Sequence, residues 1–248
     1  MTQPEGVIDA HRHLGRGVDI VAGVDEVVAD MEANDVVASV IVPSDRQIAV
    51  DNREGNDCVL EAAKASSGRL LPMCTVNPWY GQRAIDELRR AAEAGAVGLK
   101  LHPALQGFPL CHPVVHPVVA EARALGLPIY VHTGTPPYAQ PLQLAELART
   151  FADATFVLGH AGSTDFKADA IAAAQVAPNI VLETSWTMPH QLVLIVEAVG
   201  ASRVMFGSDA PLSSLSLELA NHFAAGLEPA AMADVMGGTV SRVLGIAA

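Results

Sequence analysis

The stretch VIDAHRH, residues 7–13, indicates the fold class, because a short apolar run ends there in polar side chains. Asp9, His11 and His13 alternate along it, and alternate residues of an extended strand project to the same side. Two imidazoles on one side of a strand can hold one metal ion. An isolated His-x-His pair more often has a structural role, so the position of this pair at a strand end is what favours a metal site.

Short apolar runs like this one recur along the chain. They are rich in Val, Ile and Leu, and each is followed by a stretch with helical spacing. The predicted strands are Val7–His11, Val37–Val42, Leu70–Val76, Val97–Leu101, Ile129–His132, Thr155–Leu158, Ile180–Glu183 and Val204–Phe206. The predicted helices are Asp25–Ala33, Gly55–Ala65, Gln82–Ala94, Val114–Leu125, Leu142–Phe151, Lys167–Ala177, Gln191–Val199 and Ser216–Ala224. Most strands are continuous apolar runs, as in a parallel sheet that is buried on both faces.

Eight such units favour an α/β protein with a single (β/α)8 TIM barrel, and we expect one domain over residues 1–248. An open, doubly wound sheet is the alternative, because the number of strands does not establish closure. Half of the residues are hydrophobic and only 17% are charged, which is enough apolar material for a large core.

The excess of acidic over basic residues limits the classes of binding partner that we expect. Lys plus Arg number 15 against 27 Asp plus Glu, a net charge of −12, so nucleic acid and anionic membranes are not expected partners. No apolar stretch is long enough to span a membrane, and the N-terminal residues lack the pattern of an export signal. The three cysteines form no paired motif. We therefore expect a cytoplasmic protein that acts on a small molecule.

Polar residues recur where the later strands end. Lys100 and His102 end the fourth strand, His132 the fifth and Glu183 the seventh, while His160 follows the sixth and Asp209 the eighth. In a parallel barrel these ends open onto one face, so the side chains converge on one pocket. A carboxylate from Asp209 would complete a site of imidazoles. Its alternative role is to cap the helix after the eighth strand.

Five short motifs and a closing segment carry a family resemblance: VIDAHRH, GAVGLKLHP at 95–103, YVHTG at 130–134, LGHAG at 158–162, GSDAP at 207–211 and MGGTVSRVLGI at 236–246. In this order they resemble the amidohydrolase superfamily, and within it the amidohydrolase-related group. That group contains metal-dependent hydrolases and nonoxidative decarboxylases similar to aminocarboxymuconate semialdehyde decarboxylase and γ-resorcylate decarboxylase. The closing segment departs from the group in having Thr239 in place of its usual Asn.

The resemblance implies that His11, His13, His132 and Asp209 are metal ligands and that Asp209 and His160 are catalytic. It implies one divalent ion per chain. Three imidazoles and one carboxylate favour Zn²⁺, with Mn²⁺ and Fe²⁺ as alternatives. Binuclear members of the superfamily have a carboxylated lysine at the position of Lys100, but the GLKLHP context favours one metal. Lys100 would then meet a substrate carboxylate or balance a nearby Asp or Glu.

Other residues are predicted to rim the pocket. Arg46, Trp79 and Trp186 follow the second, third and seventh strands and are candidates for substrate contacts, although surface packing is the default for each. His190 and His222 fall at a helix start and within a helix, where a hydrogen-bonded or exposed histidine is more common than a ligand.

These observations lead to three functional hypotheses. The first is hydrolysis of a small amide, lactone or ester by water activated on the metal. The second is metal-dependent decarboxylation of a small unsaturated or aromatic acid with much the same residues. The third is a noncatalytic barrel that binds a metal or a ligand. A homodimer is compatible with each of them, but no interface can be read from the sequence.

Overall fold

Eight parallel strands form the centre of the computed structural model, which describes residues 6–163 and 165–246. They are β1 (Ile8–Arg16), β3 (Ala38–Pro43), β4 (Leu70–Thr75), β5 (Gly98–Leu101), β6 (Ile129–His132), β7 (Phe156–Gly159), β8 (Ile180–Glu183) and β9 (Val204–Met205). Each overlaps a predicted strand, and β1 continues past the predicted end at His11 to Arg16. The short strand β2 (Val21–Ala22), which pairs antiparallel with the end of β1, was not predicted. The first residues considered for an export signal, 1–5, lie outside the described part of the chain.

The sheet closes on itself between β1 and the segment that continues from β9. The backbone N–H of Ala10 donates to the carbonyl of Phe206 at 3.0 Å, and the N–H of Asp209 donates to that of His11 at 2.8 Å. Further along, His13 N–H donates to the carbonyl of Ala210, also at 2.8 Å. These bonds exclude the open doubly wound sheet and confirm the barrel.

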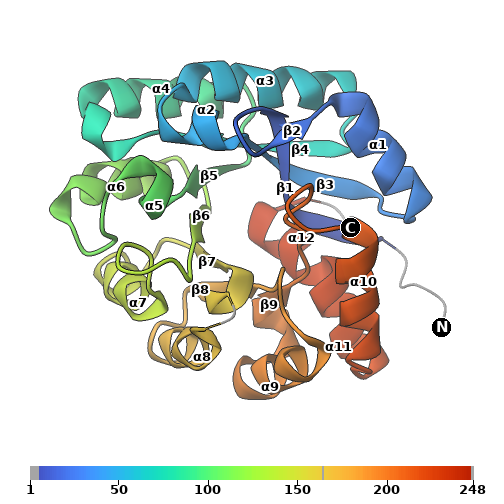
Figure 1. Cartoon of the computed structure of the whole chain (residues 1–248). Coiled ribbons are helices and arrows are strands. Elements are labelled where there is room, and N and C mark those ends of the chain that lie inside the picture. Colours follow the sequence, from blue (N-terminus) through green and yellow to red (C-terminus); the bar gives the residue numbers. More distant parts are fainter. Residues whose placement is uncertain (1–5, 164, 247–248) are drawn as a thin grey trace.

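Helices surround the strands in Figure 1 and separate consecutive parallel strands along the chain. Every predicted helix is present. The helices are α1 (Val24–Ala33), α2 (Asp45–Ala49), α3 (Asn52–Ala65), α4 (Gln82–Glu93), α5 (Pro103–Gln106), α6 (His116–Ala124), α7 (Pro141–Thr150), α8 (Lys167–Val176), α9 (Pro189–Val199), α10 (Leu215–Ala224), α11 (Pro229–Ala233) and α12 (Thr239–Leu244). Short 3-10 turns are η1 (Pro78–Tyr80), η2 (Pro113–Val115), η3 (His160–Gly162) and η4 (Ala201–Arg203), and η5 (Asp234–Gly238) is a π-helix. None of the helices in the described ranges is long and apolar enough for a bilayer crossing.

The amphipathic pattern of the helices explains their packing. In α4, Ala84, Ile85, Leu88 and Ala91 are buried, and this spacing places them on one face of the helix. A large cluster of buried residues fills the layer between strands and helices, as expected for helices that cover the outside of a barrel.

A second apolar cluster fills the interior of the barrel. It contains Ile8, Val40, Val157 and Val181, and Val240 from α12 packs into it. Burying an aliphatic side chain of this kind contributes about 1.5–3 kcal/mol relative to leaving it exposed. The floor of the barrel is therefore closed by hydrophobic contacts, and polar groups gather at the carboxyl ends of the strands.

Helix α10 holds the loops that follow β8 and β9. The carboxylate of Glu218 accepts the backbone N–H of Trp186 at 3.2 Å and the hydroxyl of Ser213 at 2.7 Å. One turn later, His222 Nδ1–H donates to the carbonyl of Glu218 at 2.7 Å, and His222 Nε2 lies 2.8 Å from the hydroxyl of Thr184. Burial lowers the pKa of His222 to about 4. His222 is thus a neutral, hydrogen-bonded helix residue.

This burial predicts an acid-sensitive fold. The unfolded chain takes up a proton on His222 below its ordinary pKa of 6.5, whereas the folded chain does so only near 4. The free energy of unfolding is therefore unaffected by this residue above pH 6.5 and decreases as the pH falls toward 4. The decrease that His222 causes is about 3 kcal/mol. Urea unfolding of metal-free protein across this range should show that His222→Gln reduces the loss by that amount. His190→Gln, which changes an exposed imidazole, serves as the control, and an unchanged loss in His222→Gln would contradict the assignment.

Candidate metal centre

Strand β1 supplies two of the predicted ligands. The rings of His11 and His13 lie side by side, with centroids 5.0 Å apart, and both are buried. Asp9 does not join them, because the pairing of β1 with β3 shifts register after Asp9 and breaks the two-residue alternation. Its carboxylate instead accepts the backbone N–H and the hydroxyl of Ser208, at 2.8 and 2.7 Å. Asp9 therefore ties β1 to the last strand segment.

Asp209 lies against the two imidazoles. Its Oδ1 is 3.4 Å from His11 Nδ1 and 3.3 Å from His13 Nε2. His13 Nδ1–H donates to the carbonyl of Pro43 at 2.9 Å, which leaves the lone pair of Nε2 facing Asp209. The three side chains form a group whose ligand atoms all lie within 4.8 Å of one another.

The carboxylate of Asp209 is buried, and its Oδ1 has no hydrogen-bond partner among the described residues. A buried acceptor without a partner is costly, so this atom fits a cation better than a purely structural role. Burial would raise the pKa of Asp209, but His160, His11 and His13 outweigh it and hold the pKa well below its usual range. The capping alternative is excluded, because α10 begins at Leu215 and Ser214 is its N-cap.

His160 and His132 form a second pair beside this group. His160 Nε2 lies 2.9 Å from His132 Nδ1, and His160 Nδ1 lies 2.7 Å from the hydroxyl oxygen of Ser185. Ser185 gives its own hydroxyl hydrogen to Glu183, so His160 carries its proton on Nδ1 and accepts from His132. His132 Nε2 then accepts the hydroxyl of Thr135 at 2.8 Å. The structure thus places His132 next to His160, outside the group formed with Asp209.

Two buried residues of the site were not among the predicted site residues. Glu183 accepts the hydroxyl of Tyr130 at 2.5 Å and the backbone N–H of His160 at 2.9 Å, and it forms a second candidate metal group with His11 and His160. The Tyr130 oxygen also lies 2.9 Å from His11 Nδ1. Glu183 was visible in the sequence as a polar residue at a strand end. Tyr130 was not, since an aromatic residue inside an apolar run is typical of any strand.

Lys100 is fully buried at the centre of the site. Its Nζ lies 2.9 Å from His11 Nε2 and 3.9 Å from the centroid of the Tyr130 ring. Burial lowers the pKa of Lys100 to about 7, although the carboxylates of Asp209 and Glu183 act in the opposite direction. The amine therefore contacts an imidazole and a ring face, and the two carboxylates act on it from a distance.

The predicted rim residues differ in which protein groups their polar atoms already bind. The guanidinium of Arg46 is paired with Asp51 and Glu54, each at 2.6 Å. The indole N–H of Trp79 donates to the carbonyl of Gly107 at 3.0 Å. Trp186 instead points its N–H into the site, where it donates to Asp209 Oδ2 at 2.8 Å. The structure therefore brings Trp186 to the candidate centre and leaves Arg46 occupied by acidic neighbours.

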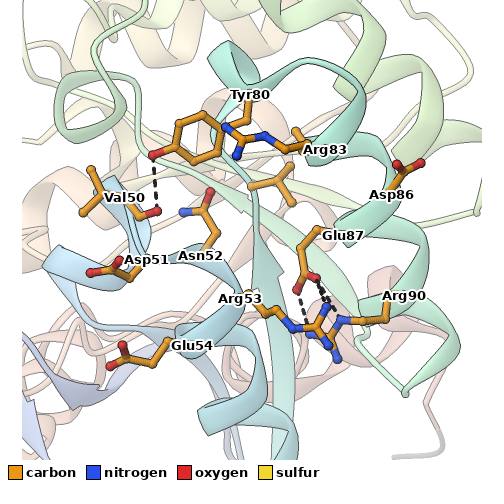
Figure 2. A pocket seen from close by; sticks show the side chains of 12 residues that line it. Val50, Asp51, Asn52, Arg53, Glu54, Tyr80, Arg83, Asp86, Glu87 and Arg90 are labelled. Carbon is orange, nitrogen blue, oxygen red and sulfur yellow. Dashed lines mark hydrogen bonds and ion pairs between the residues drawn. The ribbon is translucent and has the colours of Figure 1, made fainter.

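A separate cleft of about 530 Å³ lies between α3 and α4, outside this centre. Figure 2 shows Tyr80, Arg83, Glu87 and Arg90 on its walls. Glu87 pairs with Arg90 at 2.7 Å, and the guanidinium of Arg83 lies 5.2 Å from the centroid of the Tyr80 ring. None of the residues that line this cleft is a predicted site residue.

The sequence matches the profile of the amidohydrolase family over residues 8–246, and the chain belongs to that family. Among curated proteins none matches the sequence.

Several solved structures share the fold. The 5-carboxyvanillate decarboxylase of Sphingomonas paucimobilis is 16% identical, with a TM-score of 0.78 over 98% of this chain and 99% of that one. A 5-carboxyvanillate decarboxylase from Novosphingobium aromaticivorans, complexed with manganese and 4-hydroxy-3-methoxy-5-nitrobenzoic acid, is 13% identical, with a TM-score of 0.79 over 97% and 96% of the chains. A putative 2-pyrone-4,6-dicarboxylic acid hydrolase from Pseudomonas putida is 18% identical, with a TM-score of 0.76 over 97% of each chain.

Glu183 should be essential to the stability of the site. A glutamine there presents an amide N–H₂ to donors that now bind a carboxylate oxygen, so Glu183→Gln should lower the free energy of unfolding by about 1–3 kcal/mol. Urea unfolding followed by circular dichroism measures this loss. Glu61→Gln, which alters an exposed carboxylate on α3, should change stability by less than about 0.5 kcal/mol. Equal effects of the two substitutions would refute the structural role of Glu183.

Proposed function

We propose that this protein is a metal-dependent enzyme that hydrolyses a small carbonyl compound, an amide, a lactone or an ester. The observation that carries the proposal is the buried Oδ1 of Asp209, which faces His11 and His13 without a hydrogen-bond partner of its own. Two imidazoles and a carboxylate are a ligand set for Zn²⁺, and Mn²⁺ is the alternative that a similar structure contains.

The proposed ligands are His11, His13 and Asp209, with His132 as the fourth on the family resemblance. The contact between His132 Nε2 and Thr135 would have to be released for His132 to bind. A divalent cation held there would polarise a carbonyl group and bring the pKa of water toward neutrality.

The chain's own groups would handle the protons. Asp209 Oδ2 is the oxygen turned away from the two imidazoles of β1, and it can receive a proton from the attacking water. His160 Nδ1 lies 4.0 Å from that oxygen, and His160 is held in place by Ser185 and His132. Burial lowers the pKa of His160, and its neutral imidazole gives the Nδ1 hydrogen to Ser185. This contact would have to be released for His160 to donate that hydrogen to charge that develops on the substrate.

Decarboxylation is the second candidate, and the similar structures favour it, since two of those described above are decarboxylases of aromatic acids. The site favours hydrolysis for one reason. Arg46, an arginine at the predicted rim that could have paired with a substrate carboxylate, is instead paired with Asp51 and Glu54. A substrate carboxylate would therefore depend on the metal ion and on Lys100. The noncatalytic alternative gives no reason for His160 and Asp209 Oδ2 to lie close together.

Metal content provides the first test. Protein purified without added metal should contain about one equivalent of Zn²⁺ or Mn²⁺ by elemental mass spectrometry, because three facing ligands define one site. His11→Ala and Asp209→Ala should each lose most of it, whereas His190→Ala, which removes an exposed imidazole, should retain it. Two equivalents per chain would instead support a site with two metal ions and a carboxylated Lys100. Failure to bind any metal after reconstitution would refute the proposal.

A substrate panel separates the two reactions. Small lactones, esters and amides should be hydrolysed without release of CO₂, and aromatic or unsaturated acids should not lose CO₂. Asp209→Asn should lower kcat by at least about 100-fold in metal-loaded protein, since it removes the proposed proton acceptor. Release of CO₂ from an acid would show that decarboxylation, and not hydrolysis, is the reaction. Unchanged turnover in Asp209→Asn would favour the noncatalytic alternative.

A further inference from the structure

Trp186 differs from an ordinary surface tryptophan in what its indole does. Its side chain belongs to a residue that is 43% exposed, yet its N–H donates to a buried oxygen, Asp209 Oδ2, at 2.8 Å. Trp79, the other tryptophan of the chain, is similarly exposed at 51% but donates to a backbone carbonyl, that of Gly107. Only the indole of Trp186 is bound to the candidate centre.

The backbone holds Trp186 in an unfavourable conformation. Its φ is +60° and that of Asp209 is +55°, a region that residues with a side chain rarely adopt. Such conformations persist only where the surroundings enforce them, and they cluster at functional sites. Here the backbone N–H of Trp186 is held by Glu218, and the preceding N–H of Ser185 donates to Glu183 at 2.6 Å. The loop is braced on both sides of the indole.

We propose that Trp186 is a positioning residue for Asp209, an inference that rests on the proposed function. A carboxylate that had only Oδ1 contacts could rotate about its Cβ–Cγ bond and exchange its two oxygens. The indole N–H fixes Oδ2, and this leaves Oδ1 directed at His11 and His13. Groups that orient a metal-ligating carboxylate typically change metal affinity or activity by about 10–100-fold when they are removed.

This role differs from a substrate contact. If the ring of Trp186 only covered a bound substrate, its replacement would raise KM and leave the affinity for the metal unchanged. If the N–H positions Asp209, a phenylalanine that keeps a ring but has no N–H must weaken metal binding in the absence of any substrate. Metal affinity therefore separates the two roles.

The experiment compares Trp186→Phe with Trp79→Phe. Both substitutions remove one partly exposed indole and one N–H···O bond, but only the first removes it from Asp209. Calorimetric titration of each metal-free protein with Mn²⁺ should show a Kd about 10–100-fold higher in Trp186→Phe and within about threefold of the original in Trp79→Phe. Equal affinities in the two variants would overturn the positioning role and leave the proposed function intact. A parent protein that binds no Mn²⁺ would overturn both.

Fluorescence gives a second measurement that does not require the Trp186→Phe variant to fold. In Trp79→Phe, Trp186 is the one remaining indole, so its emission should be quenched as paramagnetic Mn²⁺ binds, with the same midpoint as the calorimetric titration. If Mn²⁺ binds to Trp79→Phe without changing the emission of Trp186, the inference is wrong.

Discussion

The candidate centre depends on the backbone hydrogen bonds that close the barrel. The N–H of Asp209 donates to the carbonyl of His11, and the N–H of His13 donates to that of Ala210. These bonds place a carboxylate beside two imidazoles that lie almost two hundred residues earlier in the chain. Asp9 reinforces the junction through Ser208. A closed parallel sheet therefore does more than bury apolar side chains, because its seam assembles the proposed ligands.

The sequence predicted the barrel well for a physical reason. Strands that are buried on both faces must be continuous apolar runs, and every such run became a strand, including Ile129–His132 and Ile180–Glu183. The same reasoning found the polar residues at the strand ends. A strand that is buried on both faces excludes charged side chains from its middle, so they occur where the strand ends. His11, His13, Asp209 and His160 accordingly meet at one end of the barrel.

What the sequence did not predict depends on side-chain direction and on local backbone geometry. Nothing in the composition of β1 indicates the register shift that removes Asp9 from the imidazole side. Tyr130 looks like packing, and only the fold shows its hydroxyl between Glu183 and His11. Arg46 could be expected to reach the pocket, but its guanidinium is paired with Asp51, the N-cap of α3, and with Glu54 in the first turn of α3.

The single metal ion proposed above suits the charges of the site better than two ions would. Glu183 receives hydrogen bonds from the hydroxyl of Tyr130 and from two backbone N–H groups. The neighbouring His160, His11 and His13 hold the pKa of Asp209 well below its usual range. Lys100 has its pKa lowered to about 7 by burial, so a cation nearby would leave it neutral. Two carboxylates then balance a single divalent ion. A second ion would bury two further positive charges, which the site could offset only by gaining anions, such as a carboxyl group on Lys100.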